Sequence, residues 1–205
     1  MSQQTVDPKQ RRNNRRVVSG LVLLFAAPVI LAYVAHYMGW FNVATQNHGT
    51  LLKAPYPHFE HFEWSSNDEQ PLHFRDFETY WWWIYVAQSD DCSVTCDTTI
   101  KWITRNHLAL GKDAEKLRRL VVFPSKVNYS DKIEASDKIL LAKGSAEGSN
   151  SEGTAVSLER GKVYLMDPHG NIFMQYDSVS NQEEAIATSK GFREDVRKAM
   201  KITGL

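Results

Sequence analysis

Residues Trp81–Cys96, WWWIYVAQSDDCSVTC, decide how the rest of the chain is interpreted. Trp81–Ala87 is rich in aromatic and β-branched side chains and is too short for an independent helix, so it predicts a strand. The run is apolar without alternation, which is typical of a strand buried on both faces of an α/β sheet. Cys92 and Cys96, the only two cysteines of the chain, follow it. The stretch therefore predicts a central strand that leads into a cysteine pair.

A helix and a second strand come next. Apolar residues recur at helical spacing over Ser93–Leu110, and Gly111 suits the end of such a helix. Leu120–Phe123 is a short apolar run that predicts a second strand, and Pro124 ends it. A strand, a helix and a strand form a βαβ unit, so we expect the two strands to be parallel.

The second half of the chain predicts a hairpin and a closing helix. Gly161–Tyr176 holds two apolar runs around the DPHG sequence at 167–170, which is the residue pattern of a type I turn. Asn181–Ile202 has an apolar stripe at helical spacing and predicts an amphipathic helix. Before the hairpin we expect a short helix at Ser130–Lys143 and, from its Gly- and Ser-rich composition, a flexible loop at Gly144–Gly153.

These elements together predict an α/β, thioredoxin-like domain over residues 72–205. Leu72–Phe74 is expected to add a short strand before the central one. The order is then strand, helix, strand, helix, hairpin and helix. In a fold of this kind the active site lies at the C-terminal end of the first core strand, which is where Cys92 and Cys96 stand.

The N-terminal part predicts a membrane anchor. Residues 1–16 carry five basic side chains against one acidic side chain, and Val17–Ala35 has no charged side chain. At about 1.5 Å per residue this run spans roughly 28 Å, close to the hydrocarbon core of a bilayer. A cleaved signal peptide is disfavoured because the run is long and no small-x-small site follows it. We expect a basic tail, a transmembrane anchor at 17–39 and an extended linker at 40–71.

The basic residues of the N-terminal tail predict which side of the membrane the domain lies on. The positive-inside rule leaves the basic tail in the cytoplasm, so residues 42–205 are exported. In a Gram-negative bacterium this is a single-pass protein of the inner membrane with its domain in the periplasm, where a cysteine pair can be oxidised. The net charge of the chain is zero, so no overall field recruits nucleic acid, and we expect no nucleic-acid partner.

Four histidines of the linker region suggest a metal site only weakly. His48, His58, His61 and His73 lie far apart in sequence except for His58 and His61, which are three residues apart. We interpret them as surface or packed histidines on an extended arm.

Three interpretations of the cysteine pair remain open. Two thiolates suit Cu(I), a redox dithiol needs the same two side chains, and an inert or structural disulfide is the third possibility. A helix N-terminus favours thiolates, whereas the neighbouring acids Asp90, Asp91 and Asp97 oppose them. A disulfide that closes so short a loop stabilises the fold by only about 2 kcal/mol, so it would be a poor structural staple.

Several of these features occurring together resemble the Sco/SenC family over residues 72–203. They are the anchor, the strand running into Cys-x-x-x-Cys, the βαβ unit, the hairpin with its VYLMDPHGNI sequence and a terminal R-x-D-V-R-K-x-M helix. The resemblance implies a membrane-anchored thioredoxin fold that delivers copper to the binuclear copper centre of cytochrome c oxidase or keeps its cysteines reduced. It implies Cys92 and Cys96 as the redox dithiol or Cu(I) ligands, with an oxidase subunit or another assembly factor as partner.

The chain departs from that family at two places. The family's cysteine motif contains prolines, whereas residues 92–96 read CSVTC. The family's third copper ligand is a histidine before the first hairpin strand, and Val156–Arg160 contains none. Glu159 lies in this stretch, but a carboxylate is a poor ligand for Cu(I). His169 and His107 are expected roughly 15–16 Å from the cysteine end, at the far ends of a strand and a helix.

Our leading hypothesis is a membrane-anchored periplasmic assembly factor for cytochrome c oxidase, acting through Cys92 and Cys96 in copper delivery or thiol reduction. One alternative is a non-catalytic scaffold that docks an oxidase subunit. Another is a general periplasmic thiol–disulfide oxidoreductase, which is less favoured because no proline precedes the hairpin where thioredoxins place a cis-proline. Whether the chain is an enzyme stays open among these three.

Overall fold

The computed structural model has two compact units, one formed by residues 1–46 and the other by residues 47–205. The parts of the chain that the structure describes are residues 8–38, 47–126 and 139–203. All strands among these residues, and the cysteine pair, belong to the second unit.

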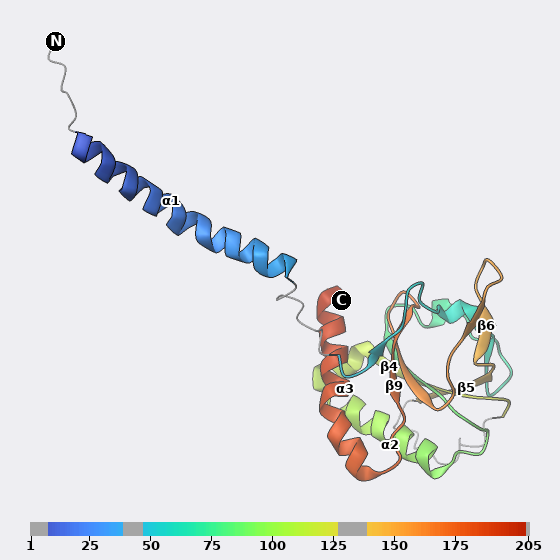
Figure 1. Ribbon diagram of the computed structural model, residues 1–205. Coiled ribbons are helices and arrows are strands. Elements are labelled where there is room, and N and C mark those ends of the chain that lie inside the picture. Colours follow the sequence, from blue (N-terminus) through green and yellow to red (C-terminus); the bar gives the residue numbers. More distant parts are fainter. Residues whose placement is uncertain (1–7, 39–46, 127–138, 204–205) are drawn as a thin grey trace. The chain divides into compact units, whose positions relative to one another are not determined.

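The described part of the first unit, residues 8–38, forms one long helix, α1 (Pro8–Tyr37), drawn in blue in Figure 1. Within it, Val17–Ala35 is the one segment of the described residues that is long and apolar enough to cross a membrane. Pro28 lies inside this segment, and such prolines are tolerated in membrane helices. The length and composition of α1 therefore suit a membrane anchor.

The second unit is built on one mixed β-sheet (Figure 1). The two inner pairs β3–β4 and β4–β5 are parallel, and the remaining neighbours are antiparallel. The strands, from one edge to the other, are β1 (Thr50–Leu51), β9 (Ile172–Asp177), β8 (Lys162–Met166), β3 (Trp81–Val86), β4 (Leu117–Phe123), β5 (Ile139–Gly144) and β2 (Trp64–Ser66).

The central strand is β3, as its sequence predicts. All of its residues are buried, and it pairs in parallel with β4 and antiparallel with β8. Its odd-numbered residues face one core and its even-numbered residues face the other. Burial of each large apolar side chain contributes about 1.5–3 kcal/mol, so this strand is a main source of the fold's stability.

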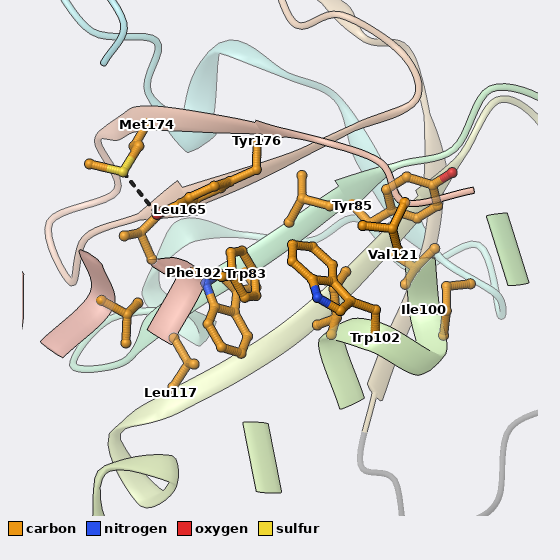
Figure 2. Packing of buried hydrophobic residues seen from close by; sticks show 14 of the residues in the cluster. Trp83, Tyr85, Ile100, Trp102, Leu117, Val121, Leu165, Met174, Tyr176 and Phe192 are labelled. Atoms are coloured by element: carbon orange, nitrogen blue, oxygen red, sulfur yellow. Dashed lines mark hydrogen bonds between the residues drawn. The ribbon is translucent and has the colours of Figure 1, made fainter. Parts of the chain in front are cut away.

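Two helices, α2 (Val94–Leu108) and α3 (Gln182–Thr203), cover one face of the sheet (Figure 1). Phe192 of α3 stacks on Trp83 of β3 and on Trp102 of α2, with ring centroids 4.2 and 4.1 Å apart. Figure 2 shows these rings together at the centre of the core. The predicted βαβ unit and closing helix are confirmed by this packing.

The opposite face is covered by short 3-10 turns instead of long helices. These are η1 (Phe59–His61) and η2 (Phe74–Asp76), which belong to the segment before β3. Phe77 packs with its ring centroid 4.2 Å from that of Phe59 and 4.5 Å from that of Trp82. From Asn47 onward, the segment for which we expected an extended linker therefore supplies both edge strands and core aromatic residues.

The predicted helix at Ser130–Lys143 is wrong over residues 139–143, which lie in β5, while residues 130–138 lie outside the described residues. β5 pairs with β4 on one side and β2 on the other. Its apolar residues alternate between the two cores, with Leu140 facing one and its two neighbours the other. Pairing with strands distant in sequence has therefore overridden the local pattern.

The predictions of a flexible loop at Gly144–Gly153 and of a strand at Leu72–Phe74 are also wrong. The Gly- and Ser-rich stretch expected to be a flexible loop contains β6 (Glu147–Ser149), which pairs with β7 (Ala155–Ser157) in a separate hairpin. Leu72–Phe74, expected to be a strand, instead leads into η2. A short connection, η3 (Gly111–Lys116), joins α2 to β4.

The predicted hairpin is confirmed as β8 and β9. Its turn is held by Asp167, whose Oδ1 accepts hydrogen bonds from the backbone N–H groups of His169 and Asn171, both at 2.9 Å. Gly170 has φ +86°, which favours glycine, and a Cβ there would lie 2.5 Å from Nε2 of His58. This turn lies at the end of β3 opposite to the cysteines, because Met166 pairs with Trp82.

A buried carboxylate fastens the start of the second unit to its last helix. Asp195 of α3 is 1% exposed, and its Oδ2 accepts hydrogen bonds from the backbone N–H groups of His48 and Gly49, both at 2.8 Å. A Cβ on Gly191 would lie 2.2 Å from the ring of His48, so a glycine is needed for this approach. The pKa of Tyr176 is raised, mainly by burial and secondly by the Asp195 carboxylate. The Tyr176 hydroxyl lies 3.3 Å from Oδ2 of Asp195.

Candidate functional site

Cys92 and Cys96 lie where β3 has ended and α2 begins. They form a disulfide, with Cα atoms 5.2 Å apart. Ser93 is the N-cap of α2, and its Oγ accepts a hydrogen bond from the backbone N–H of Cys96 at 3.2 Å. Cys96 therefore lies in the first turn of the helix, where the free N–H groups favour negative charge.

The two cysteines differ in exposure. Cys96 is 3% exposed and is part of the core beneath α2, whereas Cys92 is half-buried and packs at the edge of that core. A molecule approaching from solvent therefore reaches Cys92 more easily than Cys96. This asymmetry suits a pair in which one sulfur meets a partner and the other stays inside.

Asp90 and Asp97, two of the acids expected to oppose thiolate formation, each have partners of their own. Asp90 accepts hydrogen bonds from the backbone N–H groups of Lys126 and Ser125, at 3.0 and 2.8 Å, and from the Ser125 hydroxyl. These hydrogen bonds lower the pKa of Asp90, and the bond from the Lys126 backbone has the largest effect. Asp97 forms an ion pair with Lys101 at 2.7 Å. Each carboxylate thus has its own positive partner or donors.

The loop before β8 is tied to the end of β3. The backbone N–H of Gly161 donates to the carbonyl of Val86 at 2.7 Å, and Nη1 of Arg160 donates to the carbonyl of Ala87 at 3.2 Å. The exposed Glu159 carboxylate lies 3.7 Å from Nζ of Lys162. The loop in which the Sco/SenC family carries its histidine is therefore at the cysteine end of the sheet, with a glutamate and an arginine in it.

Several of the histidines that the sequence predicted to lie away from the cysteines, or to be packed or exposed, are at the other end of the sheet. Nε2 of His107 is 2.9 Å from the carbonyl of Leu117, the first residue of β4, and burial lowers the pKa of this imidazole. His169 is in the hairpin turn, where its carbonyl is 2.8 Å from Nε2 of His58. His58 and His61 pack together, with ring centroids 5.8 Å apart.

A resident copper centre with three ligands does not fit this arrangement. Within the described ranges, no group of three or more histidine, cysteine, aspartate or glutamate side chains is arranged to hold a metal ion. The donor set at the site is two sulfurs, and they become ligands only when the disulfide is reduced. Met166 and Met174 are buried in the two cores.

Sequence analysis did not identify two residues beside this site. Ser125 is 35 residues from Asp90, and Arg160 is 73 residues from Ala87. The only sequence signal for Arg160 was its position next to Glu159, in the stretch where the Sco/SenC family, which the sequence resembles, has its histidine. For Ser125 the only signal was its place directly after the proline that follows β4.

Residues 82–202 match the family described as "Transmembrane-like, thioredoxin-like, C-terminal domain". The chain belongs to this family. Both α2 with its cysteine-bearing first turn and the β8–β9 hairpin fall within the matched range of this transmembrane-like, thioredoxin-like family. No match to the sequence was found among curated proteins.

Solved structures with a similar fold include Sco proteins. The apo Sco1 solution structure from Thermus thermophilus is 15% identical, covers 77% of this chain and 99% of its own, and has a TM-score of 0.53. Copper-bound ScoI from Arabidopsis thaliana is 11% identical, with coverage of 67% and 96% and a TM-score of 0.47. Copper-bound yeast Sco1 is 14% identical, with coverage of 66% and 86% and a TM-score of 0.47. The predicted thioredoxin-like fold is confirmed by the family match and by the similarity to apo Sco1.

Proposed function

We propose that this chain is a membrane-anchored thiol–disulfide exchange protein that serves the assembly of cytochrome c oxidase, with Cys92 and Cys96 as its reactive pair. The observation that carries the proposal is the unequal exposure of these two residues at the start of α2. A structural staple has no need of a half-buried residue, whereas an exchange reaction needs one cysteine that a partner can reach. The resemblance of the sequence to the Sco/SenC family supports oxidase assembly as the setting, and the fold is similar to that of apo Sco1.

The proposed reaction reduces a disulfide of the partner. The thiolate of Cys92 attacks one partner sulfur and displaces the other as a thiolate, which takes up a proton. The thiolate of Cys96 then attacks Cys92 Sγ in the mixed disulfide and displaces the remaining partner sulfur, which is also protonated. The partner gains two electrons and two protons, and the product on this chain is the Cys92–Cys96 disulfide of the structure. The helix N-terminus stabilises the Cys96 thiolate before its attack.

The proposed location is the bacterial inner membrane, with the basic tail in the cytoplasm and residues from 47 onward in the periplasm. The apolar run in α1 and the basic residues before it support this orientation through the positive-inside rule. The periplasm is an oxidising compartment, so a partner's copper-binding cysteines would need reduction there. The partner is a cytochrome c oxidase subunit or another assembly factor.

Copper delivery is the second candidate, with Cu(I) as cargo. The observation that favours it is that the two cysteines lie together at the start of α2, with Cα atoms 5.2 Å apart, so that the reduced pair can present two soft donors to one ion. In that case the ion would pass to the oxidase by ligand exchange, and the reduced form alone would carry it.

The test uses the full-length protein in detergent. We expect the Cys92–Cys96 pair to equilibrate with glutathione, measured by counting alkylated thiols, and Cys96→Ser to trap a mixed disulfide on Cys92. Cys92→Ser is the matched variant and should trap far less, because Cys96 is buried. Equal trapping by both variants would contradict the assigned roles.

Two further measurements separate the alternatives. Cu(I) titration of the reduced protein against a competing chelator should show cysteine-dependent affinity tighter than about nanomolar if the chain carries copper. In cells, the double serine variant should lose oxidase activity. Unchanged oxidase activity and assembly in that variant would refute both cysteine-based functions and leave the non-catalytic scaffold.

A further inference from the structure

Arg160 places a positive charge at the cysteine end of the sheet. The residue is half-buried, and its guanidinium donates one hydrogen bond, to the carbonyl of Ala87 at 3.2 Å. The nearby acids are taken by another base, since Lys162 pairs with both Glu159 and Asp177. Within the described parts of the chain, Arg160 forms no ion pair. A guanidinium has five N–H donors and stays charged at every ordinary pH, so most of its donors remain available for an anion.

The disulfide lies at the same end of the sheet as Arg160. Ala87 follows the last residue of β3 and begins the loop that ends at Cys92. Ala87, Cys96 and the partly buried Cys92 belong to the same of the two cores. Lys162, the first residue of β8, pairs with Val86, the last residue of β3, so the loop that carries Arg160 enters the sheet at the end from which the cysteine loop leaves it. The hydrogen bond holds Arg160 at Ala87, in the loop that leads to Cys92.

We propose that Arg160 is a positioning residue that stabilises the negative charge on the cysteine sulfurs when the disulfide opens. The inference rests on the proposed exchange function. When two molecules of glutathione reduce the disulfide, the first thiolate attacks Cys92 Sγ, and the electron pair of the broken bond passes to Cys96 Sγ. A second glutathione thiolate then releases Cys92, and oxidised glutathione is the other product. A fixed cation favours each state in which a cysteine sulfur is a thiolate, and therefore favours the reduced pair.

The test compares Arg160→Ala, Arg160→Lys and the wild-type full chain in detergent. The equilibrium constant for reduction by glutathione should fall three- to tenfold in Arg160→Ala, which is about 15–30 mV toward more negative potential by the two-electron relation. Arg160→Lys keeps the charge and should stay within twofold of wild type. Arg75→Ala is the matched control, because it removes one positive charge from the exposed η2 turn, over the other core, and should change nothing.

The outcomes separate the two proposals. If the wild type exchanges with glutathione but Arg160→Ala matches it, the role of Arg160 is refuted and the exchange function stands. If Arg160→Lys falls as far as Arg160→Ala, or Arg75→Ala falls equally, the effect is not a local charge effect and the inference is refuted. If the wild type itself does not exchange, both proposals are refuted. Thermal melting of each oxidised variant checks that the fold is retained.

Discussion

At the scale of single residues, the site is assembled by contacts between side chains and distant backbone groups. The position of the cysteines at the start of a helix followed from the sequence, because a strand pattern, two acids and a helical pattern succeed one another around them. The contacts of Asp90 with Ser125 and of Arg160 with Ala87 did not follow. Every residue but proline offers the same backbone N–H and C=O groups, so nothing in the sequence marks the residue that will be chosen as partner.

We expect the contribution of Asp90 to the stability of the fold to depend on pH. Its three hydrogen bonds join the loop before Cys92 to the loop after β4, and they lower the pKa of its carboxyl. A group with a lowered folded pKa stabilises the fold above its unfolded pKa, about 3.9, and that stabilisation is lost as pH falls through the folded pKa. Asp90→Asn should therefore cost about 1 kcal/mol at pH 7.

The measurement is urea unfolding of the oxidised protein at pH 7 and at a pH below the folded pKa of Asp90. The gap in unfolding free energy between wild type and Asp90→Asn should close in acid. Asp68→Asn, which removes an exposed carboxylate, is the control and should show no gap at either pH. A gap that persists unchanged in acid would show that the carboxylate charge is not the source of the effect.

At the scale of elements, prediction succeeded where the signal is local. β3, α2, β4 and the hairpin each carry their own periodicity or turn residues, and all are found. β5 was predicted as part of a helix from its apolar residues Ile139, Leu140 and Leu141 together with Ile133, and its identity as a strand depends on pairing with β4 and β2. β6 was missed because glycine and serine give no strand signal, and it exists only through β7.

The packing of α3 on the sheet depends on one aromatic residue. Phe192 contacts the rings of Trp83, Trp102 and Tyr176 and is 1% exposed. Phe192→Ala should lower the free energy of unfolding by about 3–5 kcal/mol, because it removes a large buried ring and leaves a cavity. Urea unfolding monitored by circular dichroism measures the loss.

The same helix offers a matched control for that substitution. Ile186 of α3 is 67% exposed, so Ile186→Ala should change the unfolding free energy by no more than about 0.5 kcal/mol. Similar losses in the two variants would mean that the aromatic stack does not hold α3 to the sheet.

At the scale of the whole molecule, the second unit has a core on each face of its sheet, and the disulfide lies at the rim of one of them. Its stability comes from the buried aromatic and aliphatic side chains of both cores. The cross-link closes a loop of only a few residues and therefore removes little entropy from the unfolded chain. The proposed exchange would open and close this pair, which suits a fold whose stability does not depend on the disulfide.

Reduction should therefore leave the domain folded. We expect the far-ultraviolet circular dichroism spectrum to be unchanged in excess reductant, with a loss of about 2 kcal/mol, or roughly 4–8 °C in melting temperature for a domain of this size. The Cys92→Ser, Cys96→Ser double variant should melt with the reduced wild type. Unfolding on reduction at room temperature would mean that the disulfide is a structural staple after all.

The bond between Asp195 and the backbone of His48 and Gly49 has a mechanical consequence. These residues are where the chain, coming from α1, enters the second unit. We expect tension on the chain from its N-terminal side to load these two hydrogen bonds and to pass through Asp195 into α3. Phe192 of α3 stacks on Trp83 of β3 and on Trp102 of α2, so the pull is spread over the sheet and both helices before it reaches Cys96, in the first turn of α2.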